Sequence, residues 1–212
     1  MKTKPTPLGF RFWLTAFLGI AAFALLFAYP LLGFWRQLTL TTLLLAGIAI
    51  PPLVRHDGIH GWHWRQTAVA VGGGIASAVA LYLIFAVGNA VLTWLHDGSQ
   101  DAVLSIYAVD TSLSGWRVAL LLLFVVGPCE ELFWRGYVQR RLSCAYGWPG
   151  VMLAIGAYTI AHIASANPVL VLAAAVCGTF WSLQYRLLDN LALNVVSHAL
   201  WTAAAFVWLP FA

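Results

Sequence analysis

The chain has 212 residues, of which 62% are hydrophobic and only 8% are charged. Soluble domains carry roughly 25% charged residues, so this composition excludes an ordinary soluble protein and indicates a chain that folds in lipid. At about 20 residues for each span, the chain can hold about seven spans, which leaves no room for a separate water-soluble domain. The 11 basic residues are spread along the chain between apolar runs and form no basic stripe, so nucleic-acid binding is not expected.

Apolar stretches separated by Pro, Gly and charged residues predict the membrane spans. In chain order they fall near residues 12–29, 38–54, 67–95, 116–144, 149–165, 169–186 and 190–209. Helices are expected because backbone groups in hydrocarbon must form their hydrogen bonds within the segment. The prediction is an all-α, polytopic transmembrane bundle of about seven spans. It forms a single membrane-embedded domain over residues 1–212, with the N-terminal spans in residues 1–95.

The basic residues predict the orientation of the bundle. If the N-terminus is cytoplasmic, the outer side receives only Arg36 and Arg117, and nine basic residues lie on the inner side: Lys2, Lys4, Arg11, Arg55, Arg65, Arg135, Arg140, Arg141 and Arg186. Cytoplasmic loops of membrane proteins carry such an excess. The outer loop 96–115 contains Asp97, Asp101 and Asp110 and no basic residue, and we expect it to be solvated.

Two further features have simple interpretations. The loop 56–63 contains three histidines that could bind a metal, although a solvated loop is the simpler expectation. Cys129, Cys144 and Cys177 show no spacing typical of a disulfide framework or a zinc site, and we expect them to be packing residues. A nucleophilic Cys129 is disfavoured because the adjacent carboxylate opposes formation of the thiolate.

The only two glutamates of the chain, Glu130 and Glu131, are adjacent and follow an apolar run. Ionisable residues inside a span are costly, and they are functional by default. Glu131 and Arg135 are four residues apart in the order that favours a helical ion pair, whereas Glu130 is rotated by about 100°. We therefore expect Glu131 to be paired and Glu130 to be free for a different partner.

Helix geometry suggests that partner. If the helices on either side of the turn at 147–150 are antiparallel, Glu130 and His162 lie equally far from the turn and at similar depth. Glu130 would lie about 15 Å from Arg140, about halfway into the membrane, in a site open toward the cytoplasm. Asn194 and His198 are four residues apart and share one face of the last span.

A carboxylate and two imidazoles that converge in a membrane cavity can activate water. Glu130 could take a proton from water during attack on an amide and return it to the leaving amine. His162, His198 or the amide of Asn194 could donate hydrogen bonds to the oxyanion. Alternatively, Glu130, His162 and His198 could hold a catalytic Zn²⁺, although no helix has the His-Glu-x-x-His spacing.

Three motifs carry a family resemblance: Glu130-Glu131-x-x-x-Arg135, Tyr158-x-x-x-His162 and His198. They resemble the motifs of the CAAX protease and bacteriocin-processing family of intramembrane proteases, also called the type II CAAX protease or ABI family. The resemblance covers about residues 116–205, which it identifies as the catalytic core. The family usually has Phe at the position of Tyr158. It usually has Asn or Asp at the position of Thr202, and Asn194 is the candidate to supply that amide instead.

The resemblance implies roles for these residues. Glu130 would activate the water with help from His162, and His198 with a neighbouring amide would bind the oxyanion, while Glu131 and Arg135 hold the geometry. It implies a membrane-tethered or lipid-anchored protein or peptide substrate in the lipid bilayer, and it points to a prokaryotic inner membrane. A glutamate mechanism without a metal cofactor is favoured over a zinc-dependent one. A proton-coupled small transporter and a catalytically idle binding protein of the immunity type remain alternatives.

Overall fold

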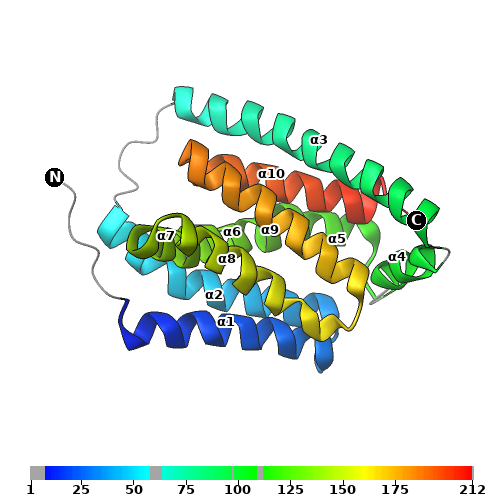
Figure 1. Ribbon diagram of the computed structural model, residues 1–212, viewed down its shortest axis with the longest axis horizontal. Helices are drawn as coiled ribbons and strands as arrows, with labels where there is room; N and C mark the ends of the chain where they lie inside the picture. Colours follow the sequence, from blue (N-terminus) through cyan, green and yellow to red (C-terminus); the bar gives the residue numbers. More distant parts are fainter. Residues whose placement is uncertain (1–7, 58–63, 97, 109–111, 212) are drawn as a thin grey trace.

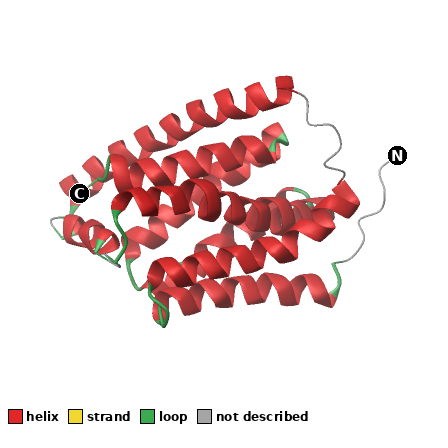
Figure 2. Ribbon diagram, turned by 180° about the vertical axis from the view of Figure 1, so that it is seen from behind, coloured by secondary structure: helices red, strands yellow, loops and turns green. Residues whose placement is uncertain are grey.

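The computed structural model describes residues 8–57, 64–96, 98–108 and 112–211. Every regular element in these residues is a helix, which confirms the all-α prediction (Figures 1 and 2). The separate helices are α1 (Phe10–Ala28), α2 (Phe34–Asp57), α3 (Trp64–Leu95), α4 (Ser99–Tyr107), α8 (Trp148–Ala161), α9 (Pro168–Leu188) and α10 (Leu191–Ala203). A short 3₁₀ helix, η3 (Ile163–Ser165), follows α8, and a π-helical stretch, η4 (Ala204–Trp208), extends α10.

One long helical run between α4 and α8 carries the two glutamates. It consists of α5 (Gly115–Leu121), the π-helical η1 (Leu122–Val126), α6 (Gly127–Glu131), the π-helical η2 (Leu132–Gln139) and α7 (Arg140–Tyr146). π-Helical turns are rare in proteins overall, but those that occur are often found at functional sites. The carboxylates therefore lie in a short α-helical segment between two unusual ones.

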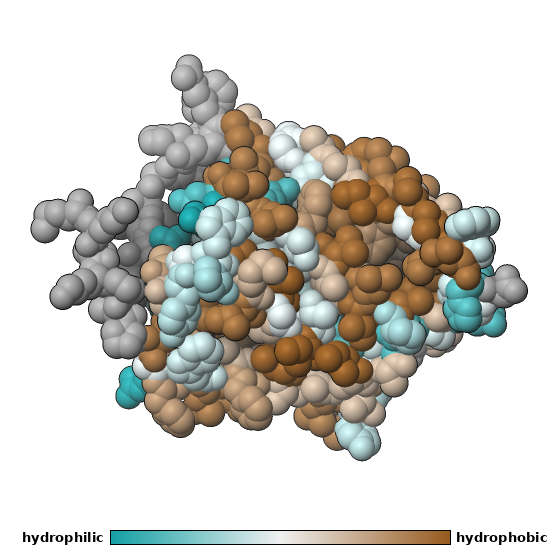
Figure 3. All heavy atoms as spheres, viewed as in Figure 1, coloured by the Kyte–Doolittle hydropathy of each residue, from teal (hydrophilic) through white to brown (hydrophobic). Residues whose placement is uncertain are grey.

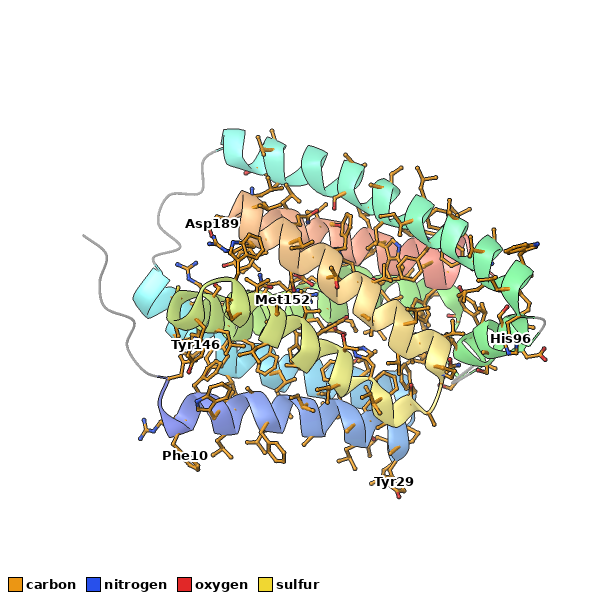
Figure 4. The ribbon with its side chains drawn as sticks, in the orientation of Figure 1. Phe10, Tyr29, His96, Tyr146, Met152 and Asp189 are labelled. Carbon is orange, nitrogen blue, oxygen red and sulfur yellow. The ribbon has the colours of Figure 1, made fainter. Side chains whose placement is uncertain are left out.

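The helices pass back and forth between two ends of the molecule. Figure 4 labels Phe10, Tyr146 and Asp189 at one end and Tyr29 and His96 at the other. We call the first the basic end, because it carries Arg11, Arg140, Arg141 and Arg186, and the second the α4 end, after the helix beside it. Apolar side chains cover much of the face between the ends (Figure 3). Such a surface fits contact with lipid.

All seven predicted stretches are helical, and five helices of the described residues are long and apolar enough to cross a membrane. These are Phe10–Ala28, Phe34–Val54, Thr67–Leu95, Pro168–Leu188 and Leu191–Trp208. The other two stretches are the run with the glutamates, which is divided by π-helical segments, and α8, which has 14 residues. The number of seven spans and the cytoplasmic N-terminus stay predictions.

The expected outer loop contains a helix that the sequence did not indicate. α4 begins with Ser99 after the predicted break and exposes Asp101 in its first turn. Asn167, the N-cap residue of α9, holds α4 in place by donating to the carbonyl of Ala102 (2.8 Å) and to the hydroxyl of Ser105 (2.9 Å). Several residues considered above lie outside the described part of the chain: Lys2, Lys4, Asp97, Asp110 and residues 58–63 of the histidine loop.

Candidate active site

Glu131 is the centre of a buried hydrogen-bond cluster. Its carboxylate accepts hydrogen bonds from Arg135 Nη1 (3.0 Å), His198 Nδ1 (2.7 Å) and Asn194 Nδ2 (3.1 Å). The ion pair with Arg135 confirms the pairing expected from the four-residue spacing. The cluster links α6 and η2 to α10, two parts of the chain more than 60 residues apart. Glu131 therefore fixes the position of the helix that carries His198.

Both amide hydrogens and the amide oxygen of Asn194 form hydrogen bonds within this cluster. Its second amide hydrogen bonds the carbonyl of Trp181 (2.8 Å), and its Oδ1 accepts from Gln184 Nε2 (3.0 Å). The side chain is completely buried and does not line the cavity described below. This placement disfavours the predicted oxyanion role, because an amide already bonded through both hydrogens has none to offer a substrate.

His198 is held by its face as well as by its edge. Its ring stacks on Trp181, with the ring centroids 3.9 Å apart and an interplanar angle of 14°. The indole of Trp181 donates to the hydroxyl of Ser197 (3.1 Å). The guanidinium of Arg135 lies over the rings of Tyr158 (4.5 Å) and Trp181 (5.5 Å), where cation–π attraction adds to its pairing with Glu131.

Glu130 faces away from the Glu131 cluster, as the 100° rotation predicts. The hydroxyl of Tyr158 donates to its carboxylate over a long distance of 3.4 Å. Glu130 is buried, yet it lines a cavity that also receives His162 and His198. The two adjacent carboxylates thus have different environments, one enclosed by donors and the other at the edge of an open space.

His162 ends α8, and its orientation fixes its tautomer. Its Nδ1 lies 2.8 Å from the carbonyl oxygen of Tyr158, one turn earlier. Because a carbonyl can only accept, Nδ1 carries the hydrogen, and in the neutral ring Nε2 keeps its lone pair. Phe23, Phe27 and Tyr158 surround the ring at centroid distances of 5.8, 5.3 and 4.8 Å. The result is an oriented base in apolar surroundings.

The cavity has a volume of about 370 Å³ and is lined mostly by aromatic and aliphatic side chains. Glu130, His162 and His198 reach it from α6, α8 and α10, so the structure brings these three predicted residues to one place. Thr202 lines it one turn beyond His198. The cavity extends from Glu130 toward the α4 end, where Tyr107 of α4 and Asn167, the N-cap residue of α9, line it. The expected opening toward the cytoplasm stays a prediction, because it depends on which end faces the cytoplasm.

The comparisons with known proteins add a family to this geometry. Residues 112–204 match the family model described as type II CAAX prenyl endopeptidase Rce1-like. The match covers 93 of the 212 residues, and it shows what this segment is similar to. The comparison with curated proteins and the comparison with solved structures found no match. All of the predicted site residues lie within the Rce1-like segment, and the match supports a CAAX-type intramembrane endopeptidase.

A metal site was the alternative use of these residues. In the described part of the chain, no group of three His, Cys, Asp or Glu side chains is placed to hold a metal ion. Glu130, His162 and His198 share the cavity of the Rce1-like segment but do not converge on a single point within it. Among the described residues these three side chains thus line one cavity without forming a metal-ligand cluster.

Trp181 is a site residue that the sequence interpretation missed. It lines the cavity, stacks on His198 and lies under Arg135. A sequence signal was present three residues earlier, at Gly178, where a Cβ would lie 2.9 Å from the ring of Tyr158. Glycine inside a helix often marks a close approach of another element, and here it marks the contact between α9 and α8.

Proposed function

We propose that the protein is an intramembrane endopeptidase in which Glu130 activates water to hydrolyse a peptide bond of a membrane-tethered or lipid-anchored protein. The observation that carries the proposal is the convergence of Glu130, His162 and His198 on one apolar cavity inside the Rce1-like segment. The apolar walls of the cavity strengthen the electrostatic interactions of the few polar groups that line it.

The proton transfers follow from the positions of the side chains. Glu130 takes a proton from the water as its oxygen attacks the carbonyl carbon, and it gives that proton to the amide nitrogen as the carbon–nitrogen bond breaks. The Nε2 lone pair of His162 accepts a hydrogen bond from the other O–H of the water and so orients it, while that hydrogen stays on the attacking oxygen. The products are a new carboxyl end and a new amine.

His198 stabilises the oxyanion that forms during attack. Its Nδ1 already donates to Glu131, so its Nε2 can donate to a substrate only in the imidazolium form. The carboxylate of Glu131 lies 2.7 Å from Nδ1. With both glutamates ionised, Arg135 and His198 leave the buried group of four side chains neutral, which limits the cost of burying it. Glu131, Arg135 and Asn194 act as positioning residues.

The mechanism proposed here requires no bound metal. His162 and His198 are each oriented through Nδ1, by a carbonyl and by a carboxylate, and both present Nε2 toward the cavity. This arrangement gives a water molecule one acceptor and the oxyanion one donor, which is sufficient for hydrolysis with Glu130 as the base.

The test is cleavage of a library of membrane-tethered peptides by purified protein in liposomes. General-base catalysis contributes about 10²–10⁴ in rate, and we expect Glu130→Gln and His162→Ala to lose most of it while remaining folded. Ser143→Ala is the matched control, because the Ser143 hydroxyl bonds only the carbonyl of Arg140 in its own helix. Equal cleavage by all variants would contradict the proposal, and no cleavage by the unaltered protein would favour an idle binding protein.

A further inference from the structure

We propose that the substrate reaches Glu130 from the α4 end, on the extracytoplasmic side of the membrane, as an extended peptide segment. The inference rests on the proposed function and adds the side of access and the class of substrate. The substrate would be an exported, membrane-tethered protein with a non-helical segment close to its anchor. The proposal rests on the packing at both ends of the cavity, the polar groups at its outer part, and the distribution of charge.

The molecule is closed between Glu130 and the basic end. Trp181 is completely buried there, and Arg135 and Gln139 are 1% exposed. Arg135 Nη2 donates to the carbonyl of Gly178 (3.4 Å) and Gln139 Nε2 to that of Ser182 (2.8 Å), which ties η2 to the backbone of α9. Among the described residues that line the cavity, none comes from η2 or α7. A peptide entering from the basic end would have to break this layer.

Toward the α4 end the cavity is continuous. Residues from Leu170 to Trp181 of α9 line it, and this part of the helix is about 16 Å long at about 1.5 Å for each residue. An extended peptide advances about 3.3 Å for each residue, so about five residues span the distance. The scissile bond would therefore lie about five residues inside the entrance.

Polar groups at the α4 end already bind main-chain atoms. Asn89 Nδ2 and Gln100 Nε2 both donate to the carbonyl of Phe211, at 3.2 and 3.3 Å, and the hydroxyl of Tyr107 accepts from the backbone nitrogen of the same residue (3.1 Å). The hydroxyl of Tyr82 donates to the carbonyl of Leu209 (2.9 Å). These groups thus hold the chain's own segment 209–211 by its backbone beside the cavity, of which Asn89, Tyr107 and Phe211 are lining residues. An extended substrate would need backbone contacts of the same kind.

The charge distribution assigns the α4 end to the outside. The basic end carries Arg11, Arg140, Arg141 and Arg186, and the excess of basic residues predicts that it faces the cytoplasm. The α4 end has Asp101 exposed beside the entrance. A cytoplasmic substrate would meet the closed layer, whereas a substrate on the outer side would meet the entrance.

The test is cysteine labelling, which does not depend on catalysis. Single-cysteine proteins are made after replacing the native cysteines by alanine: Thr202→Cys and Ala205→Cys inside the cavity, Ser105→Cys on α4, and native Cys144 alone near the basic end. A sulfonated, membrane-impermeant methanethiosulfonate reagent is added to intact bacterial cells and to inverted membrane vesicles. A thiol reacts only where reagent can reach it.

We expect the cavity and α4 cysteines to react at least about tenfold faster in intact cells, and Cys144 to react faster in inverted vesicles. Two results would overturn the proposal. In the first, both cavity cysteines react only in inverted vesicles, where Cys144 is expected to react. In the second, Ser105→Cys reacts in intact cells but neither cavity cysteine does. Because no cleavage is measured, failure here is distinct from failure of the proposed protease activity.

Discussion

Replacement of Asn194 by alanine separates a positioning role from an oxyanion role for this residue. The substitution removes three hydrogen bonds, to Glu131 (3.1 Å), to the carbonyl of Trp181 (2.8 Å) and from Gln184 (3.0 Å). The bonds to Glu131 and to Trp181 are buried, so water does not replace the lost partner there, and the bond from Gln184 is partly buried.

The expected loss of stability follows from these bonds. A side-chain hydrogen bond between membrane helices contributes about 0.6 kcal/mol on average and about 1.7 kcal/mol at most, so three such bonds give about 2 to 5 kcal/mol. The rate of cleavage by folded protein should fall by only about tenfold, because Arg135 and His198 still hold Glu131. A lost oxyanion donor would instead lower the rate by about 10²–10³.

The free energy of unfolding is measured by titration with a denaturing detergent, and cleavage is measured on the same preparations. Asn190→Ala is the matched control on the same helix: Asn190 caps α10 by accepting from the backbone nitrogen of Leu193 (3.0 Å), and loss of a cap costs about 1 kcal/mol. If Asn194→Ala keeps its stability while its rate falls about 100-fold, Asn194 binds the oxyanion and the positioning role is refuted.

Two further predictions concern packing and metal. Alanine at Gly127 would place its Cβ 2.9 Å from the backbone of Ala199, so we expect Gly127→Ala to separate α6 from α10, lower the melting temperature and abolish cleavage. In Gly156→Ala the added Cβ meets open space, so the melting temperature and cleavage should stay unchanged. Equal melting temperatures and equal cleavage for Gly127→Ala and Gly156→Ala would contradict the packing argument. We expect a chelator to leave cleavage unchanged; stoichiometric zinc by elemental analysis, with activity lost on its removal, would establish a metalloprotease instead.

The fold was predictable because lipid imposes a strong pattern on the sequence. Each span needs about 20 apolar residues, and each break needs polar or helix-terminating residues, so all seven helical stretches were located from composition alone. α4 was missed because a nine-residue segment with polar residues among its apolar ones is too short to give such a pattern, and its place depends on Asn167 from a distant part of the chain. The π-helical stretches on either side of Glu130 were likewise not predicted, because the sequence pattern does not distinguish a π-helical turn from an α-helical one.

Local relationships of the site were predicted better than distant ones. The pairing of Glu131 with Arg135 follows from spacing on one helix, and the shared cavity of Glu130 and His162 follows from counting along two helices joined by a turn. The contact between Asn194 and Glu131 depends on how α10 packs against α6, and the depth of α10 relative to Glu130 cannot be counted along the sequence because loops lie between them. Depth along the membrane does not indicate which end of the bundle is closed by side chains, so the direction in which the cavity extends from Glu130 could not be predicted.

The environments of the two glutamates explain why the chain carries both. A buried carboxylate is stable only when donors surround it, and Glu131 has three of them from three side chains. Within the described residues, the hydrogen bond to the carboxylate of Glu130 is the long one from Tyr158. Glu130 thus retains capacity to bond a water molecule at the edge of the cavity. Glu131 links the helices of the Rce1-like segment, and its neighbour Glu130 is left with the long hydrogen bond from Tyr158, as the proposed role of a general base requires.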